Sequence, residues 1–242
     1  ELDNLPEATK AGVKGKSICI TAGSRGIPEL DVMIKCVVDK LKEWGAEPFI
    51  IPAMGSHGGG VAEGQLEILE GYGITEETMG CPVRATMEVV KIGDLKDGTP
   101  VYCDKYADEA DGIVVLNKVK PHTEFKGDHE SGMIKMMAIG LAKHKGASMF
   151  HMKGFARFAE GIPELGDVFL SKKNIVFGVG IVQNAYDFIS EIEVMETSKI
   201  KERDAALLKI AKDRIPKFKF PNTEVLIIDE IGKNISGNGF DS

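Results

Sequence analysis

Short apolar runs that each lead into a glycine-containing loop and then into a stretch of helical spacing constrain this chain more than any other feature. The pattern occupies residues 16–22 (KSICITA), 23–26 and 28–45, and it repeats at residues 49–53 (FIIPA), 55–60 and 61–70. Short continuous apolar runs are typical of strands buried on both faces, and apolar residues three and four apart are typical of a helix. Strand, loop and helix in repetition favour a parallel sheet with crossover helices.

The remainder of the chain continues this α/β pattern. Further strands are expected over residues 83–92, 101–106, 112–117, 174–182 and 224–229, and further helices over residues 132–145, 155–170 and 198–214. The sequence therefore predicts an α/β fold with an open, mostly parallel, Rossmann-like sheet and helices on both faces. We expect residues 1–231 to form this domain, and the polar, glycine-rich residues 232–242 to be a linker towards a C-terminal domain absent from this chain.

Composition excludes several classes of partner. The 242 residues carry a formal net charge of -7, which argues against binding to nucleic acid or to an anionic membrane surface. No apolar run approaches the roughly 20 residues that cross a bilayer. The cysteines form no CxxC pair, which disfavours a zinc knuckle or an iron–sulfur site and fits a reducing, cytoplasmic location: Cys19, Cys36, Cys81 and Cys103.

The histidines occupy two glycine-rich segments. His57 lies in residues 54–60 (MGSHGGG), and the other four lie in residues 121–151. Histidine titrates near neutral pH and is the commonest metal ligand, so this distribution indicates a site rather than core packing. His144 is flanked by two lysines and is expected at a solvated, cationic helix end.

Three loops leave predicted strands at the edge where open α/β sheets bind ligands, namely residues 23–28, 55–60 and 118–130. Arg25, His57 and His122 would therefore face one crevice. The glycine-containing loops either present N–H groups to a phosphate or carboxylate or simply form turns.

Each of five side chains has a functional and a structural interpretation. Arg25 could grip a carboxylate in two-point fashion or be a solvated arginine. His57 and His122 could exchange protons as base and acid, or form structural hydrogen bonds. Lys135, among glycine and methionine residues, could be a nucleophile or attachment point, or extend out of a helix to water. His151 could bind a metal or be structural.

Five motifs, taken in order, resemble the lactate racemase family that uses a nickel-pincer nucleotide: Ser24-Arg-Gly-Ile27, Gly55-Ser-His57, Lys120-Pro-His122, Ser131-Gly-Met-Ile-Lys135 and His151. The resemblance is to the N-terminal domain of that family and covers nearly the whole chain. It implies a racemase or epimerase of a 2-hydroxy acid that works by hydride transfer to and from the cofactor.

The resemblance also implies a role for each residue. Lys135 would hold the cofactor covalently, and His151 would complete the nickel coordination. His57 and His122 would be the catalytic acid–base pair, and Arg25 would bind the substrate carboxylate. The cofactor, pyridinium-3,5-bisthiocarboxylic acid mononucleotide with nickel, is expected only where its synthesis enzymes are co-produced, so the implied partners are cofactor-maturation enzymes and a small 2-hydroxy acid.

Two other functions are compatible with the residues alone. A zinc-dependent hydrolase would use His57, His122 and His151 as ligands. A non-catalytic module would bind a nucleotide or phosphate through the glycine loops and would not use the histidines.

Overall fold

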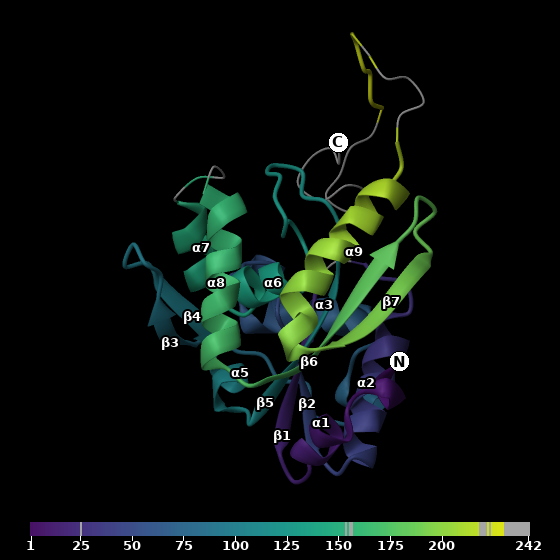
Figure 1. Ribbon diagram of the computed structural model, residues 1–242, viewed down its shortest axis with the longest axis vertical. Coiled ribbons are helices and arrows are strands. Elements are labelled where there is room, and N and C mark those ends of the chain that lie inside the picture. The colour runs from purple at the N-terminus through teal and green to yellow at the C-terminus, as the bar shows by residue number, and fades with distance from the viewer. Residues whose placement is uncertain (25, 153, 155–156, 218–221, 223, 230–242) are drawn as a thin grey trace.

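A five-stranded sheet forms the centre of the protein, in the strand order β2-β1-β5-β6-β7 (Figure 1). The computed structural model describes residues 1–24, 26–152, 154, 157–217, 222 and 224–229. The first four strands pair in parallel and β7 pairs antiparallel to β6. The strands are β1 (Ser17–Ala22), β2 (Glu47–Pro52), β5 (Gly112–Lys118), β6 (Ile175–Gln183) and β7 (Ile189–Glu196). The predicted open, mostly parallel sheet is confirmed.

Helices cover both faces of this sheet, as predicted. One face carries α1 (Glu7–Gly12), α2 (Leu30–Glu43), α3 (Ala62–Gly71) and α4 (Glu76–Met79). The other carries α5 (Lys105–Glu109), α6 (Met133–Lys135), α7 (Lys143–His151), α8 (Phe158–Lys172) and α9 (Ile200–Arg214). A separate hairpin of β3 (Val89–Asp94) and β4 (Pro100–Asp104) packs beside α7 and α8. Within the described residues, no helix is both long and apolar enough to cross a bilayer.

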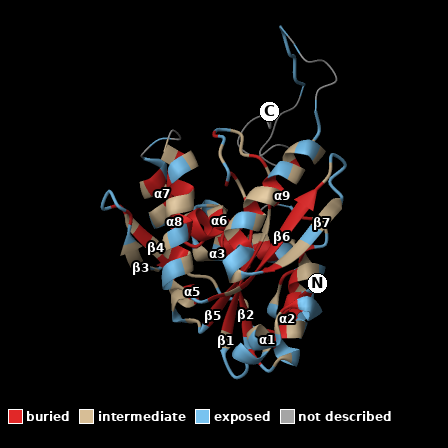
Figure 2. Ribbon diagram, in the orientation of Figure 1, coloured by how far each residue is buried: buried red, intermediate tan, exposed pale blue. Residues whose placement is uncertain are grey.

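The two cores lie on opposite faces of the central strands. In β1, Cys19 contributes to the core under α6, α8 and α9, whereas Ile18 and Ile20 contribute to the core under α2 and α3. Successive side chains of a strand point to opposite faces, so a strand covered on both sides must be apolar throughout. Figure 2 shows these central strands as buried. This explains why the strand sequences are continuous apolar runs.

The single helix predicted over residues 132–145 is wrong, because the structure divides it. Three residues of α6 continue into a π-helix (Met136–Gly140), and α7 begins after a further turn. The division lies where Gly140 meets the end of β2: a β-carbon there would be 2.5 Å from the Ala53 carbonyl oxygen. Gly55 also donates its N–H to the Gly140 carbonyl at 3.1 Å. The broken helix is therefore joined to the loop that carries His57.

The strand predicted over residues 224–229 is also wrong. Val225 and Ile227 are exposed, and these residues pair with no strand in the described structure. β7, which the sequence analysis did not predict, follows β6 through a short turn and occupies that edge of the sheet. Residues 232–242, the expected linker, lie outside the described residues.

Candidate active site

A pocket opens at the carboxyl ends of β1, β2 and β5. Its lining includes Ser24 after β1, His57 after β2, and Lys120 and His122 after β5, together with Lys135 of α6. β1 and β5 are neighbours in the sheet, and the chain winds away from them in opposite directions. Such a switch point is where open α/β sheets form a ligand crevice. Three of the predicted site residues, His57, His122 and Lys135, therefore share one pocket.

The His57 side chain is held from the loop after β1. Its Nδ1 is hydrogen-bonded to the Ser24 hydroxyl. The Ser24 carbonyl in turn accepts a hydrogen bond from the Tyr72 hydroxyl at 2.7 Å. A hydroxyl can donate or accept, so Ser24 supports His57 with its proton on either ring nitrogen.

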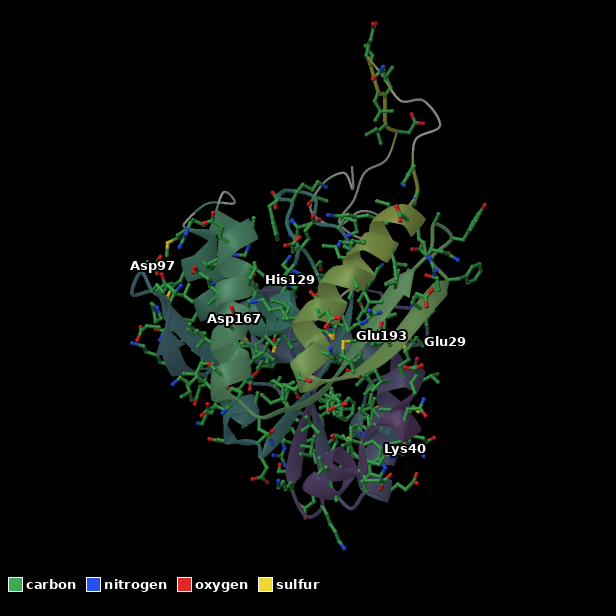
Figure 3. All side chains as sticks on the ribbon, viewed as in Figure 1. Glu29, Lys40, Asp97, His129, Asp167 and Glu193 are labelled. Atoms are coloured by element: carbon green, nitrogen blue, oxygen red, sulfur yellow. The ribbon has the colours of Figure 1, made fainter. Side chains whose placement is uncertain are left out.

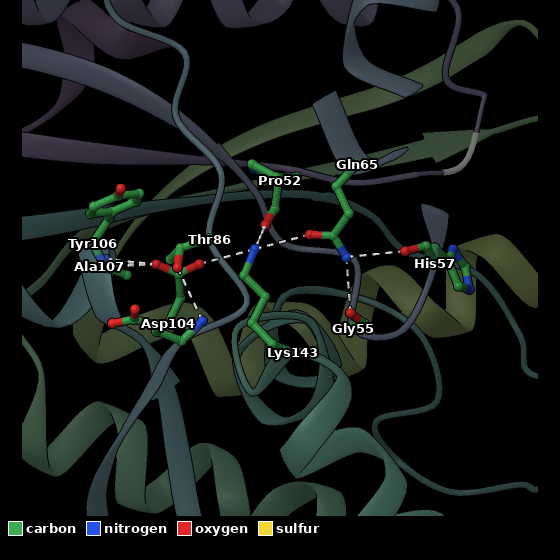
Figure 4. Close-up of polar contacts among 10 residues, drawn as sticks. Pro52, Gly55, His57, Gln65, Thr86, Asp104, Tyr106, Ala107 and Lys143 are labelled. Carbon is green, nitrogen blue, oxygen red and sulfur yellow. Dashed lines mark hydrogen bonds and ion pairs between the residues drawn. The ribbon is translucent and has the colours of Figure 1, made fainter. Parts of the chain in front are cut away.

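The His57 main chain is held from α3. Gln65 donates from Nε2 to the carbonyl oxygens of Gly55 at 2.9 Å and of His57 at 3.2 Å (Figure 4). Gly64 lies directly beneath the same loop, since a β-carbon there would be 2.2 Å from the Gly58 carbonyl oxygen. The loop that carries His57 is thus seated on the first turns of α3.

His122 is fixed by its own loop. Its Nδ1 accepts the main-chain N–H of Glu124 at 3.2 Å, which leaves the proton of the neutral ring on Nε2. Its main-chain N–H donates to the buried carboxylate of Glu130 at 2.9 Å, and Lys212 of α9 pairs with that carboxylate at 2.6 Å. The ring packs against Phe125 with centroids 4.5 Å apart.

Lys135 enters the pocket from a short helix that is anchored on both sides. Asn117, at the end of β5, donates to the Gly132 carbonyl at 2.7 Å. Asp204 of α9 accepts the main-chain N–H of Met133 at 2.7 Å and also faces Nδ1 of the buried His129. His129 is labelled in Figure 3. The Lys135 side chain is half-buried in the lining.

His151, the predicted nickel ligand, lies at the end of α7, outside the described pocket lining. Its Nδ1 is 2.6 Å from the Ala147 carbonyl, which can only accept, so Nδ1 carries a proton and the neutral ring has its lone pair on Nε2. The centroid of its ring lies 5.1 Å from that of Phe158. The Phe158 centroid in turn lies 5.3 Å from that of Phe125, the ring that packs against His122. Two phenylalanine rings therefore connect the surroundings of His151 and His122.

Two further expectations concern the role of Arg25 and the zinc site of the hydrolase alternative. Arg25, the predicted carboxylate ligand, lies outside the described residues, and its role stays a prediction. Within the described part of the chain, no three His, Cys, Asp or Glu side chains gather as a metal site. His57 and His122 share the pocket without His151, so these three histidines do not form the zinc site of the hydrolase alternative.

Comparison with known proteins identifies the family. The family described as the lactate racemase N-terminal domain matches residues 4–160. The chain belongs to this family. No curated protein sequence matches the chain significantly.

A solved lactate racemase structure shares the fold. The lactate racemase apoprotein from Thermoanaerobacterium thermosaccharolyticum superposes with a TM-score of 0.64 and 19% sequence identity, over 83% of this chain and 50% of that one. The present chain therefore spans about half the length of that racemase. At this identity the comparison shows a shared fold.

The residues that support the pocket of this family member were not predicted from the sequence. Gln65, Glu130 and Asp204 are buried and bind the main chain of pocket loops, whereas polar side chains in such stretches are usually solvated. Lys143 is completely buried although the run Lys143-His144-Lys145 indicated a solvated helix end. His144 and Lys145 of that run are exposed, as expected. Asp204 and Lys143 give no sequence signal, because their hydrogen-bond and ion-pair partners are distant in the chain.

Proposed function

We propose that this domain belongs to a 2-hydroxy-acid racemase or epimerase that works with a nickel-pincer nucleotide held at Lys135. The observation that carries the proposal is the pocket itself. It brings two imidazoles and two lysines, one of them Lys135, together at the ligand-binding edge of the sheet, in a member of the lactate racemase N-terminal domain family. The histidines come from different loops, which suits groups that act on different sides of one substrate.

The described residues fit the cofactor. Lys135 is half-buried in the pocket and can be reached by a nucleotide bound there. His151 donates Nδ1–H to a main-chain carbonyl, the arrangement typical of histidines that bind a metal through Nε2. An imidazole combined with soft sulfur donors suits nickel(II), and a cofactor that brings its own donors needs no cluster of protein ligands. We therefore assign Lys135 to covalent attachment and His151 to nickel.

The two pocket histidines handle the hydroxyl proton. Inversion of a 2-hydroxy acid passes through the flat keto acid, so the hydroxyl must lose its proton and later regain it. With Nδ1 protonated towards the Ser24 hydroxyl, His57 has its lone pair on Nε2 and can act as the base. His122 holds its proton on Nε2 and can donate a hydrogen bond to the substrate oxygen. The chemistry that a nickel-pincer nucleotide would supply when bound is reversible acceptance of the α-hydride.

The first test is the mass of Lys135. The protein is produced together with the cofactor-synthesis enzymes and nickel, and its intact mass and peptides are measured. We expect a mass increment on Lys135 that is lost in Lys135→Ala and kept in Lys120→Ala, because Lys120 is a second lysine of the same lining. An unmodified Lys135 under these conditions would overturn the proposal.

Turnover then tests the roles of the histidines. His57→Gln and His122→Gln should keep the mass increment and lose interconversion of the enantiomers of a 2-hydroxy acid, followed by chiral chromatography. In deuterated water the product should keep its original α-hydrogen, because that hydrogen leaves and returns as hydride. Deuterium at the α-carbon would instead indicate direct removal of a proton from carbon.

A further inference from the structure

Lys143 is a charged residue with no solvent-exposed surface. Its ammonium group faces three acceptors: the Pro52 carbonyl at 2.5 Å, Oε1 of Gln65 at 3.1 Å and the carboxylate of Asp104 at 2.9 Å (Figure 4). Two hydrogen bonds, to Pro52 and Gln65, and an ion pair with Asp104 thus compensate the burial of the cation. A buried ion pair is weak evidence for stabilisation, because desolvation offsets much of the attraction. The arrangement therefore needs another explanation.

Lys143 determines which way the Gln65 side chain points. The ammonium can only donate, so the amide oxygen of Gln65 must face it. The amide nitrogen then faces the carbonyl oxygens of Gly55 and His57, to which it donates. With the amide reversed, an oxygen would face two carbonyl oxygens and an NH2 group would face the ammonium. One buried charge thus fixes two hydrogen bonds to the His57 loop.

The loop itself has little conformational preference. Several of its residues adopt positive φ, a region that glycine enters freely: Gly55, Gly58, Gly59 and Gly60. Few hydrogen bonds within the loop restrict this freedom. Among them, the His57 N–H donates to the Met54 carbonyl at 3.1 Å and the Gly60 N–H donates to the His57 carbonyl at 3.2 Å. The Gln65 amide ties carbonyls on both sides of Ser56 to a rigid helix.

Asp104 connects the network to a further part of the fold. Its Oδ1 accepts the main-chain N–H groups of Tyr106 and Ala107 at the start of α5, and its Oδ2 pairs with Lys143. Asp104 also has no exposed surface. The ammonium is therefore held between the hairpin β3–β4 and the end of β2, which leaves it little room to release Gln65.

We propose that Lys143 and Gln65 are positioning residues for His57, with Asp104 holding Lys143 in place. Lys143 orients the Gln65 amide, and Gln65 places the main chain of the His57 loop. This inference rests on the proposed function for the catalytic role of His57. The positioning itself is a property of the fold and can be measured without turnover.

The diagnostic variant is Gln65→Glu. It keeps the side-chain shape and the acceptor for Lys143 but replaces the two N–H donations to Gly55 and His57 with repulsion between oxygens. Gln183→Glu is the matched control, since Gln183 is also buried and donates from Nε2 to a main-chain carbonyl, that of Asp187 at 3.0 Å, but lies at the end of β6. Urea denaturation establishes that both variants are folded.

The readouts are amide hydrogen exchange of residues 54–60 and the NMR resonance of the His57 ring, assigned by its loss in His57→Gln. We expect Gln65→Glu to speed exchange in the loop about tenfold or more, as the loss of two hydrogen bonds allows, and to shift the His57 resonance. Gln183→Glu should change neither. Unchanged exchange and an unchanged resonance in Gln65→Glu would overturn the inference. If this variant does not fold, Gln65→Met removes the same donors without a new charge and is judged by the same two readouts.

Turnover separates this inference from the proposed function. In the cofactor-loaded protein, Gln65→Glu should lower kcat roughly 100-fold with little change in KM, the effect of a misplaced catalytic group. If the proposed function is wrong, the unaltered protein shows no turnover while the exchange and NMR differences remain. If the inference is wrong, the unaltered protein and Gln65→Glu share the same kcat, exchange and resonance.

Discussion

Asp204 of α9 accepts a hydrogen bond from the main-chain N–H of Met133 at 2.7 Å and thereby caps the short helix that carries Lys135. Its second carboxylate oxygen lies 2.8 Å from Nδ1 of His129. Gly132 permits this approach, because a β-carbon there would lie 2.3 Å from the Asp204 Oδ1. The position of a pocket lysine thus depends on a residue from a distant helix.

Replacing this cap is expected to destabilise the protein. Asp204→Ala should lower the free energy of unfolding by about 3 kcal/mol, because the Met133 N–H and the buried His129 ring lose their partner. Urea denaturation measures the change. Asp213→Ala is the control on the exposed side of α9 and should stay within about 0.5 kcal/mol. Equal losses in the two variants would contradict a specific role for Asp204.

A glycine-to-alanine substitution should change stability in opposite directions at two positions of α3, because Gly64 contacts Gly58 and Gly71 has open space around it. Gly64→Ala should cost about 1–3 kcal/mol, because its β-carbon would be 2.2 Å from the Gly58 carbonyl oxygen. Gly71→Ala meets no atom within 4 Å and should stabilise the helix by up to about 1 kcal/mol. Thermal or urea unfolding of the pair measures the difference. Stabilisation by Gly64→Ala would show that the His57 loop is not seated on α3.

Local patterns predicted the architecture well because they reflect burial on one or two faces. Helical spacing of apolar residues placed a helix over residues 28–45, and the structure has α2 there. The continuous apolar run at residues 174–182 became β6. β7 escaped prediction because it mixes glutamates with apolar residues, as an edge strand with a solvated face does. The apolar residues 224–229 have strand-like composition but are exposed.

The pocket residues whose positions follow from the chain topology could be predicted from the sequence. The contacts between side chains that are distant in sequence could not. The rule for the carboxyl edge of a parallel sheet brought His57 and His122 together, and Lys135 joined them through the broken helix. Lys143 was misjudged because its acceptors lie 39 to 91 residues away in sequence, and only the finished fold brings them near. Burial of a charge cannot be inferred from its immediate neighbours.

Cysteine reactivity tests burial and its effect on thiol pKa. Burial raises the pKa of Cys81 to about 11 and raises the pKa values of Cys19 and Cys103 as well. Only the thiolate reacts with iodoacetamide, so at pH 8 these thiols should be unreactive, and Cys36, which is exposed, should be labelled alone. Cys81 labelling should rise as the pH approaches 11. Intact mass and peptide mapping measure the sites, and all four cysteines should react in denaturant.

Native labelling of Cys19 or Cys103 at the rate of Cys36 would contradict their placement in the core. The comparison is internal to one protein, so differences in reagent concentration do not affect it. Labelling of Cys81 between pH 8 and 11 also separates the two causes of protection. A thiol of ordinary pKa behind a steric block reaches its full labelling rate at about pH 9, whereas the raised pKa of Cys81 makes its rate continue to rise towards pH 11.

The loop of His122 is built around the buried Glu130. One Glu130 oxygen accepts the His122 N–H at 2.9 Å, and the other accepts the Gly127 N–H at 3.0 Å and pairs with Lys212. Glu130→Gln should therefore cost about 1–3 kcal/mol in unfolding free energy, since either orientation of the amide sets an NH2 group against an N–H donor. Glu124→Gln, exposed in the same loop, should change stability little. Urea denaturation compares the two, and a Glu130→Gln variant as stable as Glu124→Gln would mean that the carboxylate does not organise the loop.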